Sequence, residues 1–269
     1  MTKQELIVKI AETLSEAGFE SARFEATQMV EFLLGDDGSV TDEIELKASE
    51  LLNRRLDREP LQYILGEWDF YGLPFYVGKG VLIPRPDTET VVETAIKLLK
   101  GKQNPTVFDL CAGSGCIGIT LAHYTDANVK LFEKSVDALL YIFKNIKLNG
   151  IKAEVYECNV LGEPPLKDTA DLIISNPPYI RSNVLETLEP EVKHEPIMAL
   201  DGGEDGLIFY RHIAKVWKKS LNKGGWLVFE IGFDQAEDVT KIMQDEGFSH
   251  VEVIKDLGGN NRVVLGHIK

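Results

Sequence analysis

The chain has 269 residues, enough for one large domain or two smaller ones with buried cores. Hydrophobic residues make up 44% of it, yet no apolar run approaches the ~20 residues of a membrane-spanning helix. The formal net charge of -14 disfavours a general affinity for nucleic acid and favours a basic partner. Three poorly spaced cysteines and a first segment unlike a signal peptide predict a cytoplasmic protein without a disulfide framework or a metal site.

The first 60 or so residues show helical periodicity and almost no strand signal. Apolar residues recur at helical spacing between Leu6 and Leu14, and Ser21 and Thr41 are candidate N-caps of two further helices. Arginines near the end of the third helix stand where the helix dipole favours cations. We expect a small helical domain that either stabilises the protein or docks a partner.

An aromatic-rich stretch follows Pro60, which is expected to end the helices. Residues 75–77 and 81–83 flank a Gly-Lys-Gly sequence and predict a β-hairpin between two domains. After the Pro-Arg-Pro sequence that comes next, Asp87 or Thr88 is a candidate cap for another helix. Arg85, Asp87 and Glu89 could border a site, but capping and hairpin closure explain them nearly as well.

From residue 105 onward, predicted strands and helices alternate, which is typical of an α/β domain with a mostly parallel sheet. The predicted strands are residues 106–110, 129–133, 154–158, 171–175 and 226–231, and the predicted helices are residues 114–123, 135–149, 205–220 and 234–246. The last two strands, 250–255 and 262–267, are joined by too few residues for a crossover helix. They must therefore run antiparallel.

A glycine-rich turn follows the first of these strands. Gly113 and Gly115 let the backbone approach a ligand closely, and Glu133 ends the next strand, where an acid can bind ribose hydroxyls. Asp109, at the mouth of the turn, would repel a pyrophosphate and suits a cationic ligand. Asn159 follows the third strand, where a polar side chain could reach an adenine. The spacing favours S-adenosylmethionine over a dinucleotide.

A second motif, Asn176-Pro177-Pro178-Tyr179, follows the fourth predicted strand. Two prolines remove two backbone donors and hold the chain in a rigid corner, with carbonyl groups left as acceptors. Asn176 adds an amide, and Tyr179 adds a flat ring. Such a corner can hold a planar NH2 group, although a bare Asn-Pro-Pro sequence would also suit a simple strand-ending turn.

Together these motifs resemble the S-adenosylmethionine-dependent methyltransferases that modify planar nitrogen atoms. Residues 83–89, 199–203 and 205–207 narrow the resemblance to the PrmC/HemK family, which methylates the glutamine of the Gly-Gly-Gln motif in class I peptide-chain release factors. The resemblance covers essentially the whole chain. It implies an N-terminal helical substrate-docking domain (1–70), a β-hairpin linker (71–86) and a Rossmann-like seven-stranded methyltransferase domain (87–269). Release factors are then the expected partners, with no direct contact with nucleic acid or a membrane.

The resemblance also implies site residues. Asp109 and Asn159, which the glycine-rich turn indicated, are added to the residues that the resemblance implies. The expected cofactor contacts are then Asp109, Cys111, Ala112, Gly113, Ser114, Gly115, Glu133, Asn159, Val160 and Asn176. The glutamine is expected to contact Asn176, Pro177, Pro178 and Tyr179, of which Asn176, Pro177 and Tyr179 are the expected catalytic residues. Glu133 and Asn159 stand where the family commonly has aspartate.

The expected mechanism follows from the poor nucleophilicity of an amide nitrogen, whose lone pair is delocalised into the carbonyl group. Asn176 Oδ1 and the Pro177 carbonyl would accept both amide hydrogens and align the nitrogen for in-line displacement.

Three alternative functions stay open. One is an amino-group methyltransferase acting on DNA or RNA bases, which would want a basic groove. The second is a non-catalytic module that binds S-adenosylmethionine and a release factor without turnover. The third is an NAD-linked oxidoreductase.

Overall fold

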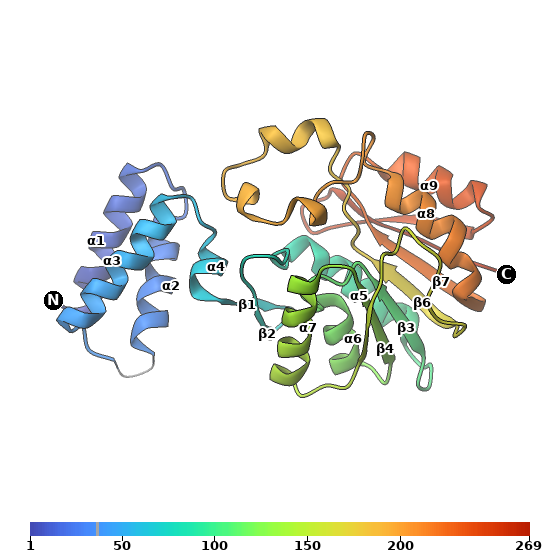
Figure 1. Ribbon diagram of the computed structural model, residues 1–269, viewed down its shortest axis with the longest axis horizontal. Coiled ribbons are helices and arrows are strands. Elements are labelled where there is room, and N and C mark those ends of the chain that lie inside the picture. Colours follow the sequence, from blue (N-terminus) through green and yellow to red (C-terminus); the bar gives the residue numbers. More distant parts are fainter. Residues whose placement is uncertain (36–37) are drawn as a thin grey trace. The chain divides into compact units, whose positions relative to one another are not determined.

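The computed structural model describes residues 1–35 and 38–269 (Figure 1). The chain forms two compact units. The first comprises Met1–Glu67 and Glu189–His194, and the second comprises Trp68–Leu188 and Glu195–Lys269. No helix among the described residues is long and apolar enough to cross a membrane.

The first unit is helical, as expected, and consists of α1 (Lys3–Glu16), α2 (Ala22–Leu34), α3 (Asp42–Leu56) and α4 (Leu61–Leu65). α1 begins with a capping box, in which Thr2 and Glu5 each accept a hydrogen bond from the other's backbone N–H. Thr41 caps α3 through Ile44 N at 3.3 Å. The predicted Ser21 cap is wrong: Ser21 precedes α2 with φ -96° and ψ 24°, which is not the extended conformation of a capping residue, and its hydroxyl makes no capping bond.

Arg55 lies in the last turn of α3, where the helix dipole favours a cation, and it is buried. Its guanidinium donates to both Glu25 oxygens of α2, at 2.6 and 3.2 Å, and to Glu191 Oε1 at 3.1 Å. It also lies 4.1 Å above the Phe19 ring. These charge-assisted bonds explain why the distant segment Glu189–His194 belongs to the helical unit.

The β-hairpin is formed by β1 (Glu67–Phe70) and β2 (Leu73–Tyr76) and not by the strands predicted at 75–77 and 81–83. Its two turn residues, Tyr71 and Gly72, have φ of 51° and 74°. Positive φ at both central residues gives a two-residue turn whose twist matches the strands, so pairing starts here. Residues 81–83 form no strand, and Ile83 N donates instead to Glu195 Oε2 at 3.0 Å.

The described part of the second unit contains the expected seven-stranded sheet, in the order β5-β4-β3-β6-β7-β9-β8. Its strands are β3 (Thr106–Leu110), β4 (Asn128–Glu133), β5 (Glu154–Glu157), β6 (Ala170–Ser175), β7 (Leu221–Glu230), β8 (Ser249–Lys255) and β9 (Asn261–His267). β3 to β7 pair in parallel, and β9 pairs antiparallel to both β7 and β8. The Rossmann-like prediction and the antiparallel end are confirmed. In such sheets, ligands bind at the carboxyl ends of the strands, where the strand order reverses.

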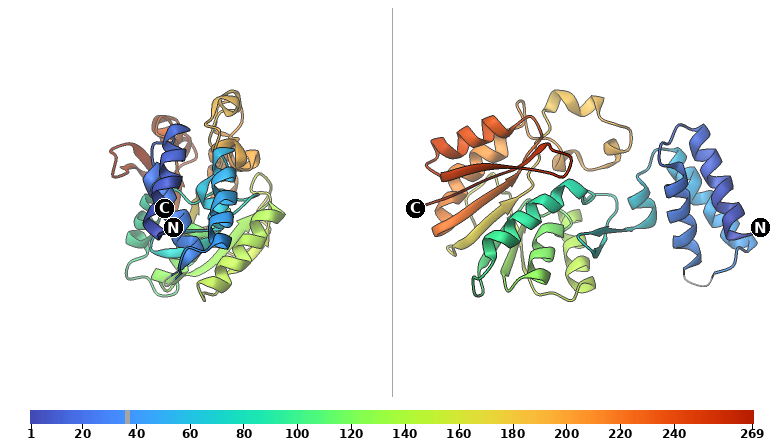
Figure 2. Two further views of the ribbon diagram at one scale, coloured as in Figure 1. Left: turned by 90° about the vertical axis from the view of Figure 1, so that its left-hand side faces the viewer. Right: turned by 180° about the vertical axis from the view of Figure 1, so that it is seen from behind.

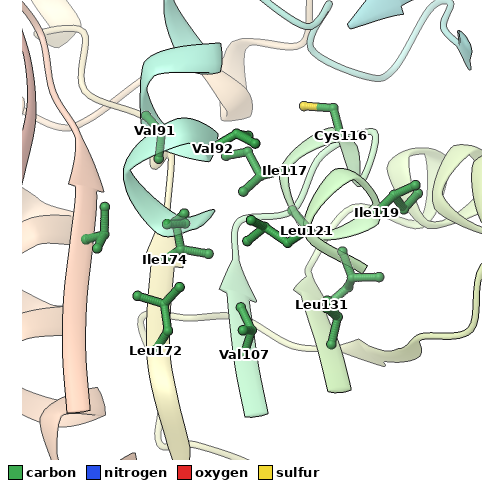
Figure 3. Packing of buried hydrophobic residues seen from close by; sticks show 14 of the residues in the cluster. Val91, Val92, Val107, Cys116, Ile117, Ile119, Leu121, Leu131, Leu172 and Ile174 are labelled. Carbon is green, nitrogen blue, oxygen red and sulfur yellow. The ribbon is translucent and has the colours of Figure 1, made fainter. Parts of the chain in front are cut away.

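Helices cover both faces of the sheet (Figure 2). They are α5 (Glu89–Leu99), α6 (Cys116–Tyr124), α7 (Val136–Leu148), α8 (Ile208–Val216) and α9 (Ala236–Asp245). Because successive strand residues point to opposite faces, β3 divides its side chains between two cores. Val107 packs with residues of α5, α6 and α7, as the close view in Figure 3 shows for α5 and α6. Phe108 packs with residues of α8 and α9.

Short 3-10 helices fill the connections: η1 (Pro86–Thr88), η2 (Ser182–Thr187), η3 (Val192–His194), η4 (Ile197–Ala199) and η5 (Trp217–Ser220). Three of them lie between β6 and α8, where the sequence predicted no element. Pro190 and Pro196 interrupt that stretch, so no longer helix can form there.

Candidate active site

A cavity of about 640 Å³ opens in the second unit, at the carboxyl ends of β3, β4 and β6. The sequence-predicted site residues that line it are Cys111, Ala112, Gly113, Ser114, Glu133, Asn159, Val160, Asn176 and Pro178. Four others, Asp109, Gly115, Pro177 and Tyr179, do not line it. The two motifs, about 60 residues apart in sequence, therefore meet at one cavity because β3 and β6 are paired neighbours in the sheet.

The turn after β3 is tight, and three of its residues have a left-handed backbone conformation, which is strained only at the non-glycine residue Cys111. Cys111, Gly113 and Gly115 have φ of 60°, 57° and 80°, and Gly115 N donates to Ala112 O at 2.7 Å. Gly118 does not extend the turn but lets α6 approach the sheet. A Cβ there would lie 2.7 Å from the Leu131 side chain and 2.9 Å from Asp109 Oδ2.

Glu133 joins the turn after β3 to the turn after β4. Its Oε2 accepts from Gly113 N at 2.8 Å, and its Oε1 accepts from Lys134 N and Ser135 N, both at 2.7 Å. A carboxylate oxygen has two lone pairs, so Oε2 keeps one acceptor position at the cavity wall. Glu133 is thus both a brace for the two turns and a candidate contact for ribose hydroxyls.

Asp109 lies beneath the turn and not at its mouth. Alternate residues of a strand share a face, so Asp109 points toward α6 as Val107 does, and its Oδ2 accepts from Gly118 N at 2.8 Å. Its Oδ1 has no hydrogen-bond partner among the described residues. Burial, more than the nearby Glu133 charge, raises the pKa of Asp109 to about 7. The structure therefore gives Asp109 a place under the backbone of the site and no surface on the cavity.

Asn159 and Val160 form the adjoining wall after β5. Asn159 is exposed, and its Oδ1 accepts from Leu161 N at 3.2 Å, which leaves its NH2 group toward solvent and the cavity. Val160 is buried, and its carbonyl accepts from Trp217 Nε1 at 2.9 Å. This backbone anchor holds the apolar Val160 side chain at the cavity wall.

The Asn-Pro-Pro-Tyr corner presents only part of itself to the cavity. Asn176 and Pro178 line it, whereas Pro177 is buried behind them. Tyr179 packs beside the core under α8 and α9, and burial raises the pKa of its hydroxyl. Its carbonyl accepts from Gln235 Nε2 at 3.0 Å, so the corner is anchored to the start of α9.

The Thr88 hydroxyl points to this corner and not to its own helix. Thr88 precedes α5 in a helical conformation, φ -64° and ψ -20°, and makes no capping bond, so the prediction of Thr88 as the cap is wrong. It accepts instead from Asn176 Nδ2 at 3.3 Å. Sequence reasoning missed this role because the contact spans 88 residues.

Three charged residues in or near the Pro-Arg-Pro sequence have different positions. One lines the cavity, and the other two make contacts elsewhere in the fold. Arg85 lines the cavity and forms an ion pair with buried Glu195. Asp87 pairs with Arg262 at 2.8 Å, and Glu89 Oε1 accepts from Tyr71 N at 2.9 Å in the hairpin turn. Only Arg85 of these borders the cavity.

Comparison with known proteins shows the family to which this chain belongs. Residues 89–197 match the family described as methyltransferase small domain, and residues 5–66 match the PrmC N-terminal domain. A release factor glutamine methyltransferase of Geobacter sulfurreducens is 41% identical over 266 residues, covering 95% of this chain and 93% of that protein. This chain belongs to the release factor glutamine methyltransferase family. The resemblance drawn from the motifs is thereby confirmed.

Other relatives of this methyltransferase bear the same description. The protein of Clostridium botulinum is 42% identical over 240 residues, covering 86% of this chain and 84% of that protein. The protein of Fusobacterium nucleatum is 45% identical over 218 residues, but the match spans only 62% of its length and 80% of this chain. A solved methyltransferase of Pyrococcus furiosus shares the fold, with a TM-score of 0.55 and 17% identity, covering 82% of this chain and 97% of that one.

Proposed function

We propose that this enzyme transfers a methyl group from S-adenosylmethionine to the side-chain amide nitrogen (N5) of the glutamine in the Gly-Gly-Gln motif of class I release factors. Family membership supports the reaction and the substrate. The observation that carries the chemistry is the orientation of Asn176 at the cavity. Its NH2 group is bonded to Thr88, so its Oδ1 is the atom available to accept a hydrogen from a planar NH2 group.

The cavity suits a ligand of this kind. Its volume of about 640 Å³ lies within the roughly 300–1,000 Å³ of small-molecule sites. The turn at Cys111 to Gly115 brings backbone close to a ligand, and Glu133 keeps an acceptor for a ribose hydroxyl. When bound, S-adenosylmethionine supplies a methyl group on a cationic sulfur, so the acceptor nitrogen needs positioning more than activation.

Asn176 Oδ1 then defines where the glutamine amide lies, whereas the expected contribution of the Pro177 carbonyl is not kept because Pro177 does not line the cavity. Among the described residues, no hydrogen bond to Asn176 Oδ1 is found. It can accept one amide hydrogen, which aims the nitrogen and favours the positive charge that grows on it. Good alignment can be equivalent to an effective concentration on the order of 10⁵ M or more. The methylated amide is acidic as a cation and loses its proton to water, so the corner itself needs no strong base.

The partners and location follow from the substrate. Release factors are the proposed protein partners, and the net charge of -14 disfavours direct contact with nucleic acid. We infer a cytoplasmic location because release factors work on the ribosome.

The Asn176→Ala variant tests this function. We expect it to fold and to lower kcat for release factor methylation by roughly 10²-fold or more, as for loss of one aligned electrostatic contact. Cofactor affinity should fall much less, because Asn176 is one of many residues at the cavity. Mass spectrometry of the purified release factor, looking for one added methyl group on the motif glutamine, gives the rate.

A matched control is Asn260→Ala, at an exposed asparagine between β8 and β9. Thermal denaturation and calorimetric titration with S-adenosylmethionine on the same preparations separate turnover from stability. If Asn176→Ala turns over as fast as Asn260→Ala and only its melting temperature falls, the corner is structural and the proposed mechanism is wrong.

A further inference from the structure

A buried polar cluster lies directly behind Asn176. It consists of Thr88, at the start of α5, and Glu230, the last residue of β7, each with only 1% of its surface exposed. The pairing of Ser175 with Phe229 in the β6–β7 ladder brings Asn176 and Glu230 side by side. Burying an ionisable carboxyl is costly, so its presence behind the reactive corner calls for a physical reason.

In this cluster Asn176 is the hydrogen-bond donor and Thr88 is the acceptor. Asn176 Nδ2 donates to Thr88 Oγ1 at 3.3 Å, and the Thr88 hydroxyl has a single hydrogen of its own. The Glu230 carboxyl is the acceptor group buried beside this pair, and both Thr88 and Asn176 lower its pKa. Glu230 Oε2 has no hydrogen-bond partner among the described residues, so the carboxyl retains acceptor capacity.

We infer that Glu230 and Thr88 are positioning residues that hold the Asn176 amide with its NH2 group toward the protein interior and its Oδ1 toward the cavity. The inference rests on the proposed function, in which Oδ1 accepts a hydrogen from the glutamine amide. Rotating an asparagine amide by half a turn exchanges Oδ1 and Nδ2, which have nearly the same shape. A rotated Asn176 would turn its NH2 group toward the NH2 group of the glutamine, and both groups are donors. Contacts on the interior side of Asn176 therefore have to fix the orientation of its amide.

A carboxylate imposes this orientation better than a neutral group because it only accepts hydrogen bonds. When Glu230 is protonated, its O–H can donate to Thr88 Oγ1 and compete with the Asn176 NH2 group. Burial raises the pKa of Glu230 to about 7, against the lowering effects of Thr88, Arg262 and Asn176. The orientation of Asn176 is therefore firmest above about pH 7 and loosens below it.

The groups around Glu230 come from several elements. The titratable and charged groups that face it are Asp87 of η1, Cys116 of α6, Tyr179 of the corner, Tyr210 of α8 and Arg262 of β9. The Arg262 cation is shared with Asp87 at 2.8 Å and Asp256 at 3.1 Å, so it does not hold the Glu230 carboxyl fully ionised. The tyrosine and cysteine groups have pKa values raised by burial and stay neutral near pH 7.

The first test removes the hydroxyl that links the two residues. Thr88→Val keeps the shape, and we expect it to lower kcat for release factor methylation by roughly 10-fold with KM and cofactor affinity changed less than about 3-fold. Thr88→Ser restores the hydroxyl and should recover most of the rate. The matched control is Thr94→Val, at a buried threonine within α5 whose hydroxyl, among the described residues, donates only to Thr90 O. A Thr88→Val enzyme as fast as Thr94→Val overturns the inference.

The second test needs no methyl transfer and so separates this inference from the proposed function. The side-chain NH2 resonances of Asn176 in ¹⁵N-labelled enzyme are assigned by their loss in Asn176→Ala. We expect them to shift with pH with a midpoint near 7 in the wild type and to lose this shift in Glu230→Gln. Asp109→Asn should keep it, although the pKa of Asp109 is also about 7.

The outcomes of the second test are distinct. Asn176 resonances that do not respond to pH, or that respond equally in Glu230→Gln, overturn the inference whatever the activity. If they respond as expected while the wild type leaves release factor unmethylated, the positioning of Asn176 stands and the proposed substrate is wrong.

Discussion

At the residue scale, Glu133 shows how one carboxylate serves both the fold and a ligand. Three backbone N–H groups from two turns donate to it, so it shapes the cavity wall before any ligand binds. The expectation from sequence concerned only the ribose. The bracing role is invisible to sequence reasoning because the N–H of Gly113 comes from a different strand-helix turn.

We expect Glu133→Ala to weaken S-adenosylmethionine binding by about 1–3 kcal/mol, the cost of losing hydrogen bonds to a charged group. The melting temperature should fall as well, because the N–H groups of Gly113, Lys134 and Ser135 lose their acceptor. Calorimetric titration below the melting temperature measures the affinity. Unchanged affinity in a folded variant would remove Glu133 from the ligand contacts.

Asp109 makes a prediction about pH. Its pKa rises from 3.8 in the unfolded chain to about 7 in the folded one, so between these values the folded state keeps a proton that the unfolded state releases. Its contribution to the free energy of unfolding therefore falls as pH rises from about 4 to about 7. Between about pH 5 and about pH 8 the loss should amount to about 2–3 kcal/mol.

Asp109→Asn removes this proton and keeps an oxygen for Gly118 N. Urea denaturation at the two pH values measures the free energy of unfolding of both proteins. Raising the pH should lower the free energy of unfolding of the wild type more than that of the Asp109→Asn variant. A difference that is the same at both pH values contradicts the raised pKa of Asp109.

At the scale of elements, η4 places exposed apolar side chains at the rim of the cavity. Ile197 and Met198 of η4 line the cavity and yet are 66% and 47% exposed. Their exposure follows from the short 3-10 geometry between Pro196 and Leu200, which leaves no buried face. Exposed apolar side chains at the edge of a site are suited to contact a protein substrate.

We expect Ile197→Asp to raise the KM for release factor about 10-fold, because burying this side chain against a substrate contributes about 1.5–3 kcal/mol. Cofactor affinity should stay within about 2-fold. Leu257→Asp is the control, since Leu257 is fully exposed in the β8–β9 connection and does not line the cavity. Steady-state kinetics with release factor as the varied substrate distinguish the two variants, and equal KM values would exclude η4 from substrate contact.

At the scale of the whole molecule, the division into two units separates cofactor chemistry from the helical unit. All residues that line the cavity belong to the second unit. The helical unit has two exposed phenylalanines, Phe24 and Phe32, on α2. We propose that the helical unit docks the release factor, a role that the family resemblance implies and that the residues of this unit alone left open.

An enzyme beginning at Trp68 should therefore bind S-adenosylmethionine with nearly unchanged affinity and methylate intact release factor far more slowly. A short peptide with the Gly-Gly-Gln motif is the matched substrate, and both enzymes should methylate it at similar rates. Circular dichroism must confirm folding, because the truncation leaves Glu191 without Arg55 and Arg58. Equal kcat/KM of the two enzymes for the intact factor would reduce the helical unit to an appendage.

The sequence by itself determined the helical N-terminal segment and the alternation of strands and helices along the chain from residue 105. It also determined the antiparallel direction of the last two strands and both motifs of the site. These features depend on local rules: periodicity of apolar residues, glycine at positive φ and proline at the end of a strand. The family could be recognised for the same reason, since its motifs are continuous in sequence. The hairpin was misplaced because Tyr71 adopts a positive φ that its residue type does not indicate.

Only the tertiary structure decided which polar groups share a partner. It turned Asp109 toward α6, joined Glu191 to Arg55, and placed Thr88 and Glu230 behind Asn176. These contacts link residues up to 136 positions apart. Asn176 and Glu230 lie side by side because the paired parallel strands β6 and β7 bring their carboxyl ends to one edge of the sheet. Local sequence carries no record of such neighbours, since a buried polar group takes its partner from whatever element the fold packs against it.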